Sequence, residues 1–119
     1  MEPPPFDICE RTFQFALRIV GVCQVLDKQH GVSWTLSKQL LRSGTSIGAN
    51  VEEGQAGQSR ADFVSKYSIA RKELRETRYW LRLLRGSDLL EANTAAPLLA
   101  ECDELLKILT SIIRKTQGN

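Results

Sequence analysis

The sequence predicts an all-α protein, an antiparallel up-down-up-down four-helix bundle that forms a single domain over residues 1–119. Three observations predict this class. Proline stands only at positions 3, 4, 5 and 97, so nearly the whole chain can be helical. Four stretches repeat apolar residues in steps of three and four, and none alternates with the two-residue period of a strand. The expected helices span about residues 7–28, 33–54, 60–85 and 94–116, and their short connections favour antiparallel neighbours.

The first expected helix, residues 7–28, begins at Asp7 as its N-cap and carries two apolar rows. One row steps by four and three through Cys9, Phe13, Ala16, Val20 and Cys23. A second row widens the expected buried face and consists of Ile8, Phe15, Ile19, Val22 and Leu26.

The second expected helix, residues 33–54, has Ser33 as its predicted N-cap and is less apolar. Its apolar line consists of Leu40, Gly44, Ile47 and Val51. Gly44 and Gly48 lie one turn apart, and each costs about 1 kcal/mol of helix propensity relative to alanine. We therefore expect a neighbouring helix to approach closely at these glycines.

The third expected helix, residues 60–85, follows Ser59 as its N-cap and has the most regular apolar line of the chain. That line consists of Phe63, Tyr67, Ala70, Leu74, Thr77, Leu81 and Leu84. The fourth helix is expected to begin between Glu91 and Ala96, with Pro97 in its first turn. Its apolar line is Leu98, Cys102, Leu105, Leu109 and Ile112, flanked by Leu99, Leu106 and Ile113.

The composition argues against most catalytic and metal-dependent classes. The chain has one histidine, His30, in a polar run between two expected helices, and three isolated cysteines, so no zinc-ligand spacing occurs. We therefore predict no metal and no cofactor. An odd number of cysteines at apolar positions indicates reduced thiols. Because no apolar run approaches about 20 residues and the first residues lack a signal-peptide pattern, a cytoplasmic protein without membrane association is expected.

The net charge of +2 conceals a strong asymmetry. Residues 60–85 contain eight basic and three acidic side chains, and residues 86–119 contain three basic and five acidic ones. Five arginines of the third helix recur in steps of four and three, beside the apolar line: Arg71, Arg75, Arg78, Arg82 and Arg85. Together with Lys72 this stripe is a candidate surface for nucleic acid or another polyanionic partner.

Other interpretations of the arginine stripe remain open. The arginines could instead form ion pairs with Glu73 and Glu76, or across to Glu101, Asp103 and Glu104, either within one chain or between subunits. Tyr79 and Trp80 interrupt the stripe and are candidate interface residues, or simply the flank of the core.

A polar strip is expected along the second helix. Its residues step by four, four and three: Arg42, Ser46, Asn50 and Glu53. The favoured interpretation is a structural polar network that fixes helix register, with Arg42 paired to Glu53, Glu73 or Glu76. The less favoured one is acid–base chemistry by a carboxylate pair near Asn50, drawn from Glu52, Glu53, Glu73 and Glu76.

Two stretches of the chain, LRSGTSIGANVEEG and DFVSKYSIARKELRETRYWLRLL, resemble a bacterial four-helix-bundle family first found in intervening sequences of large-subunit ribosomal RNA genes. The matching positions are Arg42, Ser46-Ile47, Asn50-Val51, Glu53-Gly54, Asp62-Phe63 and Glu76. The chain departs from the many members with A-x-G-S, since it has Ala70-Arg71-Lys72-Glu73, and is similar instead to a K-E-x-x-E-T-x-Y-W-L subgroup.

The resemblance implies a closed homo-oligomer, typically a pentameric barrel with a central channel, and no enzymatic activity. It also implies similarity to accessory proteins of diversity-generating retroelements, which are basic bundles that contact a reverse transcriptase and nucleic acid. The leading expectation is therefore a non-enzymatic homo-oligomeric bundle, a homopentamer, that binds RNA, DNA or a nucleic-acid enzyme through its arginine stripe. The alternative is a structural or protein-interaction module whose arginines form ion pairs and bind no nucleic acid.

Overall fold

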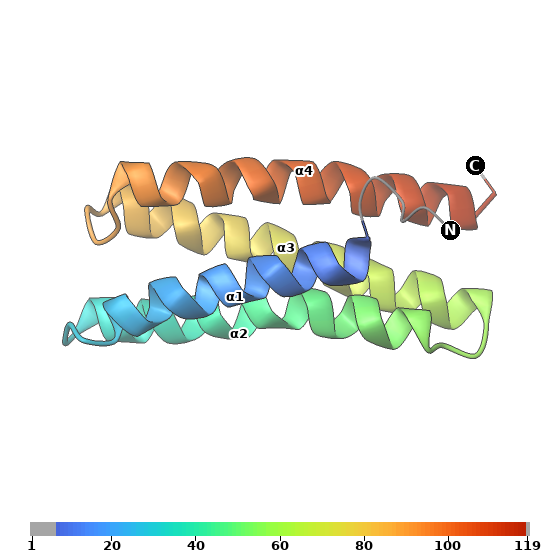
Figure 1. Ribbon diagram of the computed structural model, residues 1–119, viewed down its shortest axis with the longest axis horizontal. Coiled ribbons are helices and arrows are strands. Elements are labelled where there is room, and N and C mark those ends of the chain that lie inside the picture. The colour runs from blue at the N-terminus through green and yellow to red at the C-terminus, as the bar shows by residue number, and fades with distance from the viewer. Residues whose placement is uncertain (1–6, 119) are drawn as a thin grey trace.

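The computed structural model describes residues 7–118, which form four α-helices and contain no strand. The helices are α1 (Ile8–Leu26), α2 (Val32–Gln55), α3 (Arg60–Gly86) and α4 (Ala92–Thr116). They alternate in direction along a body of 45 × 25 × 24 Å, so the start of α1 and the end of α4 lie toward the same end (Figure 1). Helix α1 packs on α2, α2 on α3 and α3 on α4, whereas α1 and α4 approach each other at few positions. The predicted all-α antiparallel four-helix bundle is confirmed.

Two of the three predicted serine or aspartate caps are present. The Asp7 carboxylate accepts hydrogen bonds from the amides of Cys9 and Glu10, and the Ser59 hydroxyl accepts one from the amide of Asp62. The prediction that Ser33 caps α2 is wrong. The helix begins one residue earlier, after Gly31 with a φ of 82°, and Ser33 is buried with its hydroxyl directed to the carbonyl of Leu26.

Helix α4 begins within the predicted interval between Glu91 and Ala96. Its first residue is Ala92, two residues before position 94, and Glu91 at the N-cap position provides no side-chain hydrogen bond. Pro97 therefore lies in the second turn, not in the first as the sequence predicted. Ala95, in the first turn, is fully buried one turn before Leu98.

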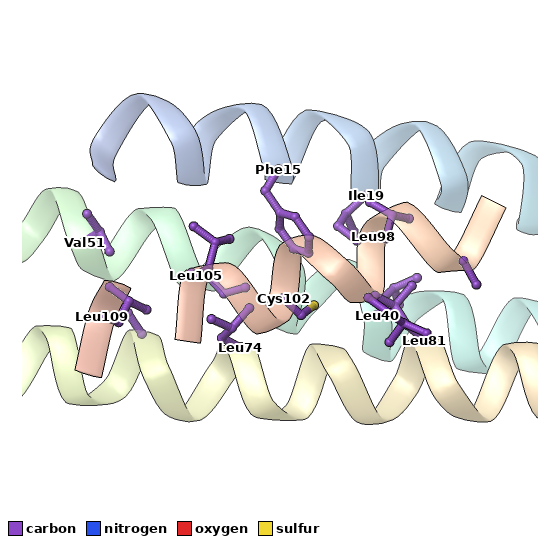
Figure 2. Packing of buried hydrophobic residues seen from close by; sticks show 14 of the residues in the cluster. Phe15, Ile19, Leu40, Val51, Leu74, Leu81, Leu98, Cys102, Leu105 and Leu109 are labelled. Carbon is purple, nitrogen blue, oxygen red and sulfur yellow. The ribbon is translucent and has the colours of Figure 1, made fainter. Parts of the chain in front are cut away.

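The core runs the length of the bundle and is filled from all four helices (Figure 2). The predicted apolar lines of α2 and α3 are buried, apart from the half-buried Phe63. Tyr67 is fully buried, stacks on the Phe63 ring at a centroid distance of 4.0 Å, and accepts a hydrogen bond of 2.7 Å from the Gln55 amide. In α4 the buried member of the last turn is Ile113, whereas Ile112 is half-buried.

The two apolar rows of α1 have different environments, which corrects the expectation of one wide buried face. The second row provides the core residues, and Phe15 and Ile19 point from α1 toward the other helices (Figure 2). In the first row only Cys23 is buried, and Phe13 is 48% exposed. Part of the apolar surface of α1 therefore faces away from the core.

The glycines of α2 allow α1 to approach closely, as predicted. A Cβ atom at Gly44 would lie 2.8 Å from Cγ2 of the buried Ile19, and one at Gly48 would lie 3.2 Å from Oγ1 of Thr12. Gly21 of α1, in contrast, has open space where its Cβ would be. The loss of helix propensity at Gly44 and Gly48 is thus offset by packing between α1 and α2.

Alanine at Gly44 and alanine at Gly21 are expected to change stability in opposite directions. Gly44→Ala should lower the free energy of unfolding by about 1–2 kcal/mol, because overpacking at Ile19 exceeds the gain in helix propensity. Gly21→Ala should raise it by about 0.5–1 kcal/mol, because only propensity changes. Chemical denaturation followed by circular dichroism measures both, and a stabilising Gly44→Ala would contradict the close approach.

The three cysteines are free thiols, with Cys23 and Cys102 buried and Cys9 half-buried. Burial raises the pKa of the Cys102 thiol to about 12, so this side chain is a neutral core residue at physiological pH. Over residues 7–118, no helix is both long and apolar enough to cross a membrane.

Candidate functional site

Helix α3 presents different side chains to the core, to α2, to α4 and to solvent, because residues three and four positions apart share a helix face. The side chains on its core face are completely buried: Tyr67, Ala70, Leu74, Thr77, Leu81 and Leu84. This buried line fixes the rotation of α3 in the bundle. It therefore decides which of the predicted arginines point outward.

Two arginines of the predicted stripe lie against α4. Arg78 donates a hydrogen bond of 2.8 Å from Nε to Oδ1 of Asp103, and Arg71 approaches Oγ1 of Thr110 at 3.5 Å. Both side chains are half-buried. Arg78 is therefore paired within the chain, as the alternative interpretation expects, whereas the contact of Arg71 with a neutral hydroxyl leaves its charge unpaired within residues 7–118.

The solvent-facing residues of α3 form a separate row, which we call the outer row. Its members follow one another in steps of three and four: Ser65, Ser68, Lys72, Arg75, Tyr79, Arg82 and Arg85. The last five of these are exposed. The structure thus divides the predicted stripe, because Arg75, Arg82 and Arg85 are exposed in the outer row, whereas Arg78 pairs with Asp103 and Arg71 contacts Thr110.

The positive charge of the outer row is not compensated within residues 7–118. The row contains no carboxylate, and no ion pair in this range involves Lys72, Arg75, Arg82 or Arg85. The acidic side chains predicted to face α3 are paired with other cations: Glu101 with Arg11, Asp103 with Arg78 and Glu104 with Lys107. Of these three carboxylates, only Asp103 pairs with a residue of α3. The negative charges of α4 therefore do not neutralise the outer row, and the electrostatic potential at its surface is positive.

On the opposite flank of α3, three of the six residues of the predicted polar network contact one another. Arg42 of α2 donates to Oε2 of Glu73 at 3.0 Å and to Oε1 of Glu76 at 2.5 Å. The third partner considered for Arg42, Glu53, is instead 3.5 Å from Nζ of Lys66. One guanidinium thus bridges two carboxylates one turn apart and connects α2 to α3.

The other polar residues of α2 bond to their own helix. The Ser46 hydroxyl donates to the carbonyl of Arg42 at 2.6 Å, and the Asn50 amide donates to the carbonyl of Ser46 at 2.8 Å. Within residues 7–118, no three or more His, Cys, Asp or Glu side chains are grouped so that they could hold a metal ion. His30 is exposed in the loop between α1 and α2.

The Arg42 bridge is expected to make stability depend on pH. The hydrogen bond from Arg42 holds the pKa of Glu76 below its ordinary value of 4.5. Glu76 therefore stabilises the fold above its unfolded-state pKa, and this contribution is lost as the pH falls through the lower, folded-state pKa. Arg42→Met should lower the free energy of unfolding by up to about 1 kcal/mol near neutral pH, with a smaller difference from wild type in acid.

Denaturant unfolding at neutral and at acidic pH measures this difference. Lys66→Met is the matched control, because it removes a cation from the Lys66–Glu53 contact, in which the Glu53 side chain is 66% exposed. The control should show almost the same pH dependence as wild type. An Arg42→Met variant that differs from wild type equally at both pH values would contradict the proposed bridge.

Tyr79 and Trp80 are adjacent in sequence but have different environments. Trp80 is half-buried against the core cluster, whereas Tyr79 is 54% exposed. Their rings meet edge to face, with centroids 5.3 Å apart and an interplanar angle of 71°. Of the two predicted interface candidates, Tyr79 belongs to the outer row and Trp80 belongs to the flank of the core.

Helices α1 and α2 share an exposed apolar surface that was not predicted from the sequence, and we call it the α1–α2 apolar face. It contains a groove of about 340 Å³. The groove is lined by Phe13, Ala16, Leu17, Val20, Thr45, Gly48, Ala49 and Glu52. Glu52 is the one charged residue in this lining. The sequence contains a signal for this face, because α1 has two full apolar rows and a single core-facing side cannot bury both of them.

Comparisons with known proteins agree with the architecture. The family model described as 23S rRNA-intervening sequence protein matches residues 5–111. A crystal structure of a protein of unknown function from the S23 ribosomal protein family of Bacteroides thetaiotaomicron VPI-5482 is 41% identical, with a TM-score of 0.85. The match covers 91% of this chain and 99% of that one. Among curated protein sequences, no match was found. The chain therefore belongs to the 23S rRNA-intervening sequence protein family.

Proposed function

We propose that this protein is a non-enzymatic module that binds RNA or DNA through the outer row of α3. The observation that carries the proposal is the set of exposed cations at Lys72, Arg75, Arg82 and Arg85, none of which has a carboxylate partner within residues 7–118. Guanidinium groups bind phosphate oxygens through paired hydrogen bonds, and a row along a helix can follow a phosphate backbone.

Three of the four candidate acid–base carboxylates, and Asn50, have structural partners, which supports a non-enzymatic role, whereas Glu52 forms no ion pair within residues 7–118. Glu73 and Glu76 are bridged by Arg42, and the Asn50 amide is bonded to its own helix. A carboxylate in a charge-assisted pair is a poor general base. The same contacts explain these residues as a connection between α2 and α3.

The alternative function is a protein-interaction or structural module whose arginines form ion pairs. The Arg78–Asp103 ion pair favours it for Arg78. A nucleic-acid enzyme such as a reverse transcriptase is the partner implied by the family resemblance. We prefer nucleic acid itself, because the four exposed cations lie in one row along a helix and such a row can follow a phosphate backbone.

We further propose that the protein self-associates through the α1–α2 apolar face, in a homo-oligomer that the family resemblance implies to be a pentamer. Phe13 and Leu17 are about half exposed, and the groove between them and α2 has Glu52 as its one charged lining residue. Interfaces between identical chains are apolar and depleted of charge, whereas a nucleic acid requires cations.

The free thiols of Cys23 and Cys102 support a reducing, cytoplasmic setting.

The salt dependence of binding tests the nucleic-acid proposal. Labelled RNA and DNA are titrated with wild-type protein over a series of salt concentrations. The logarithm of the affinity should fall linearly with the logarithm of salt, by about 0.7–0.9 per phosphate contacted. Four cations then predict a slope of about −3. A failure to bind either nucleic acid at low salt would overturn the proposal.

A further inference from the structure

An aromatic ring lies in the middle of the outer row. Tyr79 follows Arg75 by four residues and precedes Arg82 by three, so the three side chains share one helix face. Along the helix axis, Arg75 is about 6 Å and Arg82 about 4.5 Å from the tyrosine. Tyr79 is 54% exposed and is not part of the core cluster.

The Tyr79 ring is oriented and accessible. Trp80 meets it edge to face at 71° and 5.3 Å, which is the one aromatic contact of the ring within residues 7–118. Beside the ring is an open depression of about 510 Å³, lined by Tyr79, Arg82, Leu83, Arg85, Gly86 and Ser87. At Gly86, one of the lining residues, a Cβ atom would have no neighbour within 4 Å. The depression thus combines an aromatic ring, an apolar edge and two unpaired guanidinium groups.

We infer that the outer row binds unpaired nucleic-acid strands, with a base stacked on Tyr79 and the flanking phosphates bound by Arg75, Arg82 and Arg85. This inference rests on the proposed function, because it assigns the kind of nucleic acid that the same surface takes. Any of the four bases can stack, so the surface has no base preference built in by hydrogen bonding.

The distinction between single and double strands follows from which groups each nucleic acid offers. Both present phosphates to the arginines, and both are therefore bound by the charge of the outer row. Only an unpaired strand presents the face of a base to an aromatic side chain, because the bases of a duplex are stacked on one another. Tyr79 thus adds affinity for single strands alone, whereas Arg75 and Arg82 add affinity for both.

Fluorescence polarisation with a labelled single strand and the duplex of the same sequence tests the inference, in RNA and in DNA. Tyr79→Ala should weaken single-strand binding by roughly 5- to 100-fold. It should leave duplex binding and the salt slope unchanged, because no phosphate contact is removed. Tyr79→Phe keeps the ring and should bind single strands as wild type does.

Trp34→Ala is the matched control, since Trp34 is an aromatic residue of α2 that is 46% exposed and lies outside the outer row. It should leave the affinity for the single strand and for the duplex unchanged.

Equal effects of Tyr79→Ala on single strands and duplexes, or no effect on either, would overturn the inference. The proposed function would then still stand if Arg75→Glu/Arg82→Glu weakens binding. Wild-type protein that binds neither strand would overturn both.

Discussion

Reversing the charge of Arg75 and Arg82 together is expected to weaken the binding of RNA and DNA by at least about 100-fold. Each lost hydrogen bond to a charged phosphate is worth about 1.5–3 kcal/mol, and the new carboxylates add repulsion. The slope of log affinity against log salt should become shallower by about 2 units, since two phosphate contacts are lost. Both side chains are exposed and unpaired within residues 7–118, so Arg75→Glu/Arg82→Glu should leave the fold intact.

A charge-matched control separates the outer row from the net charge of the protein. Lys28→Glu/Lys115→Glu makes the same change in net charge at two exposed positions outside α3. It should weaken binding only slightly and leave the salt slope nearly unchanged. Equal losses in both double variants would contradict a localised binding surface and would favour attraction by overall charge alone.

Charging the α1–α2 apolar face is expected to dissociate the proposed homo-oligomer. In Phe13→Glu/Leu17→Glu, two carboxylates would be buried at the interface between subunits, whereas in the monomer both positions are exposed. Light scattering should therefore report the mass of a multimer for wild type and a mass near 13.4 kDa for the variant.

The control for this variant changes two other exposed apolar residues. Val32→Glu/Ile69→Glu adds the same charge outside the α1–α2 apolar face and should keep the wild-type mass. A wild-type protein that is already a monomer would contradict self-association. A multimer that persists in Phe13→Glu/Leu17→Glu would show that the interface lies elsewhere on the bundle.

The helices were predictable because their signals are local. The spacing of Tyr67, Leu74 and Leu81 alone identifies the buried face of α3, and Ser59 marks its start. The N-cap of α2 and the place of Pro97 in α4 were predicted wrongly. Ser33 has the chemistry of a cap but lies in the contact with α1, where its hydroxyl donates to the carbonyl of Leu26. Pro97 lies in the second turn of α4, after the buried Ala95. For Ser33, tertiary packing outweighs a local preference.

The candidate site was predictable in composition but not in geometry. The spacing of the arginines places them along α3 but treats Arg75 and Arg78 as equivalent. Their difference arises from α4, which supplies Asp103 opposite Arg78 and no partner for Arg75. Likewise, two apolar rows on α1 show an excess of apolar surface, but only the packed bundle shows that Phe13 faces outward.

The central claim, that α3 binds nucleic acid through its outer row, is tested most directly by photo-crosslinking. A thiouridine-containing single-stranded RNA is crosslinked to wild-type protein, and tryptic peptides are mapped by mass spectrometry. Trypsin cleaves after Arg78 and Arg82, so an adduct on Tyr79 is confined to residues 79–82. Trp34 serves as the internal reference, because it is exposed to a similar extent on another helix. We expect adducts on residues 79–82, and adducts concentrated on the Trp34 peptide would contradict binding by the outer row.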